Sequence, residues 1–112
     1  MPPEIFMRFM ELVSTLESAS PLEELEPIEK KLLQIIALTN LRNERLSVKD
    51  LMHNSGVASP ATTHKYIHAM VYKDWIELAS TDDSRRKQVK LTSGAMRHFD
   101  KIGKAVLSIT RK

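Results

Sequence analysis

The stretch that decides the fold is residues 47–70, SVKDLMHNSGVASPATTHKYIHAM. Ser47 and Asp50 stand three positions apart, and this capping pair predicts a short helix that begins after Ser47. The Asn-Ser-Gly sequence at residues 54–56 predicts the end of that helix. We therefore expect a short helix followed by a tight turn.

A second helix is predicted to begin at Pro60, because Ser59 can cap free amides and proline fits the first helical position. It should run to about Lys73. Its inner face consists of Thr63, Ile67 and Met70. The opposite face consists of Ala61, Lys65, His68 and Tyr72, with Thr62 and His64 at its edges. Small, hydroxyl and cationic groups thus gather near the amino end of this outward face.

Two short strands are predicted after this helix. Residues 75–79 and 88–91 have strand composition, and the polar segment 80–87 between them is turn-forming and basic. We therefore expect a hairpin over residues 75–91. Trp75 is large and begins the first strand, so we expect it in the core beneath the hairpin.

The chain before this unit contains a further helix. The SPLE pattern at residues 20–23 predicts a helix start, with a short turn that ends near Leu25. The main helix should restart at Pro27 and run to about Leu38. The polar stretch 39–45 is predicted to be a loop.

The first and last helices carry more apolar side chains than one small core needs. Helical spacing in residues 1–19 gives a stripe of Ile5, Phe9, Val13 and Leu16, widened by Phe6, Met10 and Leu12. Thr92 is predicted to cap the last helix, in residues 93–112, whose apolar positions are Phe99, Ile102, Val106 and Ile109. The surplus favours contact with a second subunit. The alternative is a first helix that is thickly buried within one chain.

Composition narrows the class of protein. Three glycines, five prolines and 28% charged residues exclude collagen-like, linker-like and disordered chains. Residues 1–40 hold three basic and seven acidic side chains, whereas residues 41–112 hold 14 basic and seven acidic ones. Such asymmetry predicts that the later part meets a polyanion. No apolar run approaches the roughly 18 residues of a membrane span, and no leader pattern follows Met1, so we expect a soluble, cytoplasmic protein.

The order helix, helix, tight turn, helix and basic hairpin is that of a winged helix-turn-helix, a mainly α fold with a small β-hairpin wing. Residues 83–94, DSRRKQVKLTSG, resemble the wing signature of the multiple-antibiotic-resistance regulator (MarR) family. That signature is an Asp and Arg cluster, a strand and then Leu-Thr-x-x-Gly. The similarity extends back to Leu46 and more weakly to Ile28. It implies a dimeric transcriptional regulator whose recognition helix enters the major groove and whose wing arginine enters the minor groove.

The resemblance also implies roles for single residues. Arg85 matches the wing arginine, and Asp83 matches the acidic residue that orients it. The reading part of the recognition helix is matched by Ser59, Ala61, Thr62 and Lys65. The sequence departs from the family where Ser80, Thr81 and Asp82 replace an earlier Asp-x-Arg, and where Asp74 replaces a glycine. A left-handed turn at Asp74 would be mildly strained.

Plainer interpretations stand beside these roles. Arg85, Arg86 and Lys87 could form a solvated turn, with Arg85 held by Asp83 in a surface pair worth well under about 1 kcal/mol. His68 and Tyr72 could simply be exposed. His64 and His68 have metal-compatible spacing, but zinc needs a third ligand and the chain has no cysteine, so we predict no metal site. The six methionines could line a ligand cavity or fill gaps in the core.

We predict a single domain over residues 1–112 with a dimerisation helix at 1–19, a DNA-binding core at 27–92 that includes the wing, and a C-terminal helix at 93–112. The expected function is sequence-specific binding of double-stranded DNA as a homodimeric transcriptional repressor at an imperfect palindrome. The alternatives are a protein-interaction winged helix and a plasmid or phage replication or partition factor. No enzymatic activity and no cofactor are expected, and the sequence leaves a small-molecule effector open.

Overall fold

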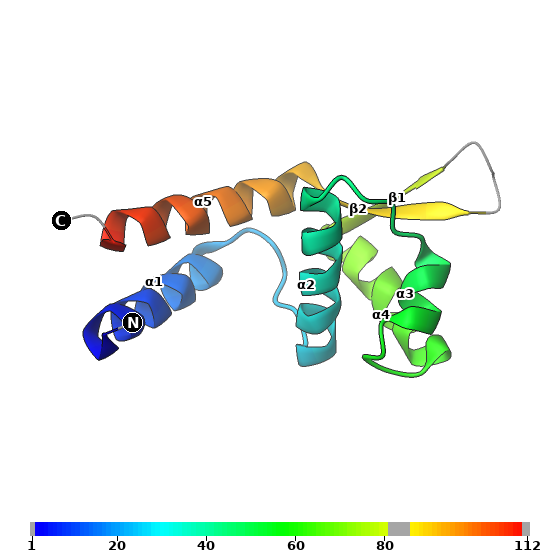
Figure 1. Cartoon of the computed structure of the whole chain (residues 1–112), viewed down its shortest axis with the longest axis horizontal. Coiled ribbons are helices and arrows are strands. Elements are labelled where there is room, and N and C mark those ends of the chain that lie inside the picture. Colours follow the sequence, from blue (N-terminus) through cyan, green and yellow to red (C-terminus); the bar gives the residue numbers. More distant parts are fainter. Residues whose placement is uncertain (1, 81–85, 111–112) are drawn as a thin grey trace.

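The computed structural model describes residues 2–80 and 86–110. Within these residues the elements follow the order predicted for a winged helix-turn-helix (Figure 1). They are α1 (Pro3–Ala19), α2 (Pro27–Leu41), α3 (Val48–Asn54), α4 (Pro60–Tyr72), β1 (Ile76–Ser80), β2 (Lys87–Leu91) and α5 (Ser93–Thr110).

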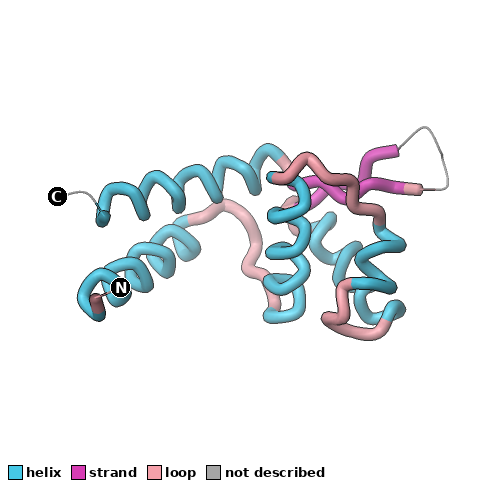
Figure 2. Tube along the Cα trace, viewed as in Figure 1, coloured by secondary structure: helices cyan, strands magenta, loops and turns pink. Residues whose placement is uncertain are grey.

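The elements form two parts of an elongated molecule that measures 50 × 26 × 26 Å. Helices α1 and α5 lie side by side and form an arm, and the outer ends of both helices lie at the same end of the molecule (Figure 1). Helices α2, α3 and α4 with the hairpin form a lobe, joined to the arm by the loop after α1 and by the start of α5 (Figure 2). The hairpin points away from the arm.

The helix-turn-helix is built by the two caps that the sequence predicts. The backbone N–H of Asp50 donates to Ser47 Oγ at 3.0 Å, and that of Ser47 donates to Asp50 Oδ2 at 3.3 Å. Gly56 turns the chain with φ +69°. The N–H of Thr62 donates to Ser59 Oγ at 3.3 Å and opens α4. Both predicted helix starts are confirmed.

The hairpin is confirmed as an antiparallel pair with Ile76 opposite Leu91 and Ser80 opposite Lys87. Trp75 lies just before β1 and is 6% exposed, as expected of a core residue. Asp74 before it adopts φ +64°, the predicted left-handed conformation. Thr92 follows β2 at the other end of the hairpin. Its hydroxyl accepts the N–H of Ala95 at 3.0 Å and thereby caps α5.

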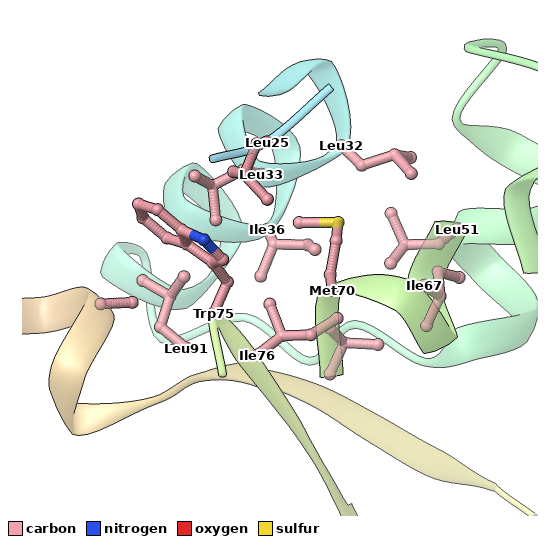
Figure 3. Packing of buried hydrophobic residues seen from close by; sticks show 12 residues of the cluster. Leu25, Leu32, Leu33, Ile36, Leu51, Ile67, Met70, Trp75, Ile76 and Leu91 are labelled. Carbon is pink, nitrogen blue, oxygen red and sulfur yellow. The ribbon is translucent and has the colours of Figure 1, made fainter. Parts of the chain in front are cut away.

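One apolar core holds α4 and the hairpin against α2. The predicted inner face of α4, Thr63, Ile67 and Met70, is fully buried. Figure 3 shows Met70 and Ile67 directed toward Leu32, Ile36 and Leu51, and Trp75 between Leu33 and Leu91. Burial of this kind contributes roughly 1.5–3 kcal/mol for each large apolar side chain, so α4 is firmly seated.

The segment between α1 and α2 corrects one prediction. The helix start predicted at Ser20, Pro21 and Glu23 is wrong, because residues 20–26 are not helical. The hydroxyl of Ser20 instead accepts the N–H of Leu22 at 3.1 Å. Proline disfavours helical backbone in the residue before it, and Glu26 before Pro27 is accordingly extended. The restart at Pro27 is confirmed.

The end of α2 corrects a second prediction, since residues 39–41 continue the helix instead of opening a loop. Asn40 accounts for the extra turn. Its side-chain Oδ1 accepts the N–H of Leu91 at 3.0 Å, and its Nδ2 donates to the carbonyl of Val89 at 3.3 Å. The helix end is thereby tied to β2. At the same edge of β2, the one not paired with β1, the N–H of Val89 donates to the Leu46 carbonyl at 2.8 Å.

Candidate nucleic-acid interface

The outward face of α4 presents the side chains that the sequence assigned to it. This face consists of Ala61, His64, Lys65, His68 and Tyr72, all of which are exposed. Tyr72 is 83% exposed at the carboxyl end of the helix. Because the opposite face is locked in the core, the outward face is held rigidly toward solvent. Within the described residues, Lys65 forms no ion pair or hydrogen bond, so its ammonium group is available to a ligand.

Two hydroxyl residues at the amino end of α4 are bonded to one another. The hydroxyl of exposed Ser59 donates to Thr62 Oγ1 at 2.9 Å, in addition to accepting the Thr62 N–H. Thr62 is half-buried. Both predicted contact residues therefore lie at the start of the outward face, but the cap already uses the Ser59 oxygen.

Two histidines on the outward face form a close pair. The Nε2 atoms of His64 and His68 are 3.0 Å apart, and the rings meet edge to face with centroids 4.4 Å apart. A neutral imidazole has one N–H, so one ring donates to the other. The sequence placed both residues on this face but did not predict their contact.

The hairpin contributes cationic side chains. Arg86, Lys87 and Lys90 are exposed, and Lys90 lies opposite Glu77 in the strand register. Tyr72 and Lys90 were not among the predicted contact residues, although both stand on surfaces that the sequence already assigned to DNA. Arg85 and its predicted partner Asp83 lie outside the described residues, so their roles stay predictions.

A buried ion pair fixes the far end of α4. Lys73 Nζ donates to Glu29 Oε1 at 2.6 Å, and the Glu29 side chain is fully buried. This hydrogen bond raises the pKa of the Lys73 ammonium above its usual 10.5, against the opposing effect of burial. Glu29 Oε1 also accepts the N–H of Glu26 at 2.8 Å, whereas its Oε2 is buried and has no hydrogen-bond partner among the described residues. The sequence analysis missed this pair, because its two residues are far apart in the chain.

The arm shows where the predicted dimer residues lie. All seven are half-buried within the chain: Ile5, Phe9, Val13, Leu16, Ile102, Val106 and Ile109. No residue of α1 is fully buried, which argues against the thickly buried helix that was the alternative. Five other large apolar side chains of the arm are exposed: Phe6, Met7, Met10, Met96 and Leu107.

Two cavities lie where the arm meets the lobe. One holds about 410 Å³ and is lined by Trp75, His98 and the acidic residues Glu17, Glu23 and Glu24, among others. The other holds about 400 Å³ beside the start of α5. None of the described methionines lines either cavity, so the suggested methionine-lined site does not coincide with them. His98 stacks edge to face on Trp75 at 5.2 Å, and burial lowers the pKa of His98 below 6.5.

Among the residues that the structure describes, no group of three or more His, Cys, Asp or Glu side chains is arranged to hold a metal ion. Among the described helices, none combines the length and the apolar character needed to cross a membrane.

Comparison with known proteins identifies the fold. No protein-family model matches the chain, and no curated protein matches its sequence. A probable transcriptional regulator from Pseudomonas aeruginosa is similar in structure, with a TM-score of 0.58 and 18% identity over 96% of this chain and 77% of that one. A MarR-like transcriptional regulator from Thermotoga maritima gives a TM-score of 0.52 and 17% identity over 96% and 82%. The chain therefore has the winged-helix fold of these proteins, as the sequence predicted.

Proposed function

We propose that this protein is a sequence-specific double-stranded DNA-binding transcriptional regulator that acts as a homodimer and represses by occupying an operator. The observation that carries the proposal is the outward face of α4, exposed and rigidly backed by a buried inner face. The fold shared with two transcriptional regulators supports it.

The chemistry of the outward face suits a major groove. A helix with its side chains is about 10–12 Å across and fits a groove about 12 Å wide. Lys65 can donate to guanine O6 or N7, and the small Ala61 leaves room for a thymine methyl group. Arg86 and Lys87 on the hairpin would then reach the neighbouring phosphates or minor groove. Arg85 would join them if the family role applies.

The arm is proposed to form the dimer. Five large apolar residues of the arm stay exposed after α1 and α5 have packed together: Phe6, Met7, Met10, Met96 and Leu107. A two-fold dimer would place two α4 helices one turn of DNA apart, about 34 Å, so the operator should be an imperfect palindrome.

The experiment is selection of bound duplexes from a random pool, followed by affinity measurement over a range of salt concentrations. We expect a palindromic consensus and an affinity that falls linearly with log salt, at about −0.9 per phosphate neutralised. Lys65→Ala should cost about 1–3 kcal/mol at one base position and relax the preference there. Lys31 is an exposed lysine of α2, so Lys31→Ala is the matched control. It should change neither the affinity nor the base preference.

Other outcomes favour the rival functions. Failure to enrich any sequence, together with binding to an acidic protein, would indicate a protein-interaction winged helix. Enrichment of a site that lies at a plasmid or phage origin would indicate a replication or partition factor. A uniform loss across all sequences in Lys65→Ala would make Lys65 a phosphate contact.

A further inference from the structure

The histidine pair on α4 has a geometry that DNA contact does not require. His64 and His68 stand one helical turn apart, both are exposed, and their Nε2 atoms are 3.0 Å apart. In the free protein the two nitrogens share one proton through a hydrogen bond. The two ring nitrogens are therefore close enough to bind one ligand together.

In place of the sequence-based prediction of no metal site, we propose that His64 and His68 form a binding site for a divalent transition-metal cation, with Cu²⁺ and Ni²⁺ favoured over Zn²⁺. With metal–nitrogen bonds of about 2.0–2.1 Å, a 3.0 Å separation corresponds to an angle of about 95° at the metal. That angle fits neighbouring ligands in a square-planar or octahedral site. A tetrahedral zinc site would hold the two nitrogens about 3.3 Å apart.

The site needs only small changes to accept the cation. The ring that donates the hydrogen bond moves its proton from Nε2 to Nδ1, a change of tautomer that leaves the ring neutral and both Nε2 atoms unprotonated. No third His, Cys, Asp or Glu of the described residues joins the pair, so water fills the remaining positions. Imidazole is a ligand well suited to copper and nickel, and divalent copper binds such sites most tightly.

A cation at this place would affect DNA, a consequence that rests on the proposed function. His64 and His68 lie on the outward face of α4, the face that would approach the base edges. The helix already fills most of the groove width, so a cation with its waters would hold the helix away from the bases. Metal and specific DNA should therefore exclude one another.

Metal binding is tested first without DNA, by calorimetric titration of CuCl₂ into protein that carries no histidine tag. We expect one Cu²⁺ per chain and an electron paramagnetic resonance spectrum with coupling to imidazole nitrogen. His64→Ala and His68→Ala should each weaken binding at least about tenfold, since even supporting contacts of a metal site are worth that much. His53→Ala removes another exposed histidine, at the end of α3, and should leave binding unchanged. Equal binding by wild type and both α4 variants would overturn the site.

The second arm measures affinity for the selected duplex with and without Cu²⁺. Wild type should lose affinity when copper is added, whereas His64→Ala should give the same affinity in both conditions. An unchanged wild-type affinity in saturating copper would overturn the exclusion. A protein that binds copper through the pair but never binds DNA would instead contradict the proposed function, and the metal site would stand.

Discussion

Single residues at the start of α4 serve the fold and the proposed surface together. The Ser59 oxygen caps the helix by accepting the Thr62 N–H, and its hydroxyl donates to Thr62 Oγ1. The cap was predictable, because it depends on residues three positions apart. The hydroxyl pair and the contact of His64 with His68 were not, since each depends on side-chain rotamers that sequence does not fix.

His98 should make stability depend on pH. Burial lowers its pKa below 6.5 in the folded chain, with Glu17 opposing and Lys101 adding to the effect. Well above pH 6.5 the side chain is neutral in both states, so its titration does not affect stability there. Below it the unfolded chain takes up the proton first, so the free energy of unfolding falls until the pH reaches the folded-state pKa. The urea concentration at the midpoint of unfolding should therefore decrease as the pH is lowered from about 7.5 to about 5.

The matched variant for this prediction is His98→Gln, which cannot titrate. Trp75 is the single tryptophan of the chain, so its fluorescence in urea reports the midpoint. The midpoint of His98→Gln should change less over the same pH range than that of wild type. Equal changes in the two proteins would assign the pH effect to other groups.

Among the elements, α4 is held against α2 by two kinds of contact, apolar packing and an ion pair. Apolar residues seat its inner face, and the Glu29–Lys73 pair ties its carboxyl end to the first turn of α2. The helices themselves were predictable from local caps and spacing. The extension of α2 through Asn40 was not, because its partners Val89 and Leu91 lie about fifty positions away in the chain and only the folded hairpin brings them near.

Lys73→Met should be strongly destabilising, by about 3–5 kcal/mol, because it leaves the Glu29 carboxylate buried without its cation. The measurement is urea unfolding at neutral pH. Lys104→Met is the matched control, since Lys104 pairs with Asp100 at 3.0 Å on the exposed face of α5. That variant should lose less than about 1 kcal/mol.

A double variant separates charge burial from the loss of lysine packing. Glu29→Leu combined with Lys73→Met removes both charges and should be more stable than Lys73→Met alone. If Lys73→Met and Lys104→Met destabilise the protein equally, the buried pair does not hold α4 in place.

At the scale of the whole molecule, basic and acidic side chains lie at different places along the elongated fold. The hairpin with its cations points away from the arm, and acidic Glu17, Glu23 and Glu24 line the junction between arm and lobe (Figure 1). The sequence predicted this division of charge and both apolar stripes of the arm. It did not predict that the stripes would pack on each other within one chain, because periodicity gives a face but not its partner. Of the side chains left exposed for a dimer, Phe6 and Met10 belong to the predicted stripe, whereas Met7, Met96 and Leu107 do not.

The dimer prediction can be tested at those exposed positions. Phe6 and Met10 are 48% and 49% exposed, so Phe6→Asp and Met10→Asp should disturb the single chain little. In a dimer each would bury an unpaired carboxylate, which is costly. We expect both variants to shift the protein toward monomer in sedimentation velocity at micromolar concentration, with helix content retained and affinity for a palindromic duplex reduced.

Leu38→Asp provides the control for this test, because Leu38 is equally exposed, at 48%, but lies on α2 outside the arm. It should leave the sedimentation of the protein unchanged. Dissociation by Leu38→Asp as much as by Phe6→Asp would move the interface from the arm to the lobe. A wild-type monomer at micromolar concentration that still protects a palindrome as one cooperative unit would contradict the arm dimer, since the two copies would then meet only when DNA holds both half-sites at about 34 Å.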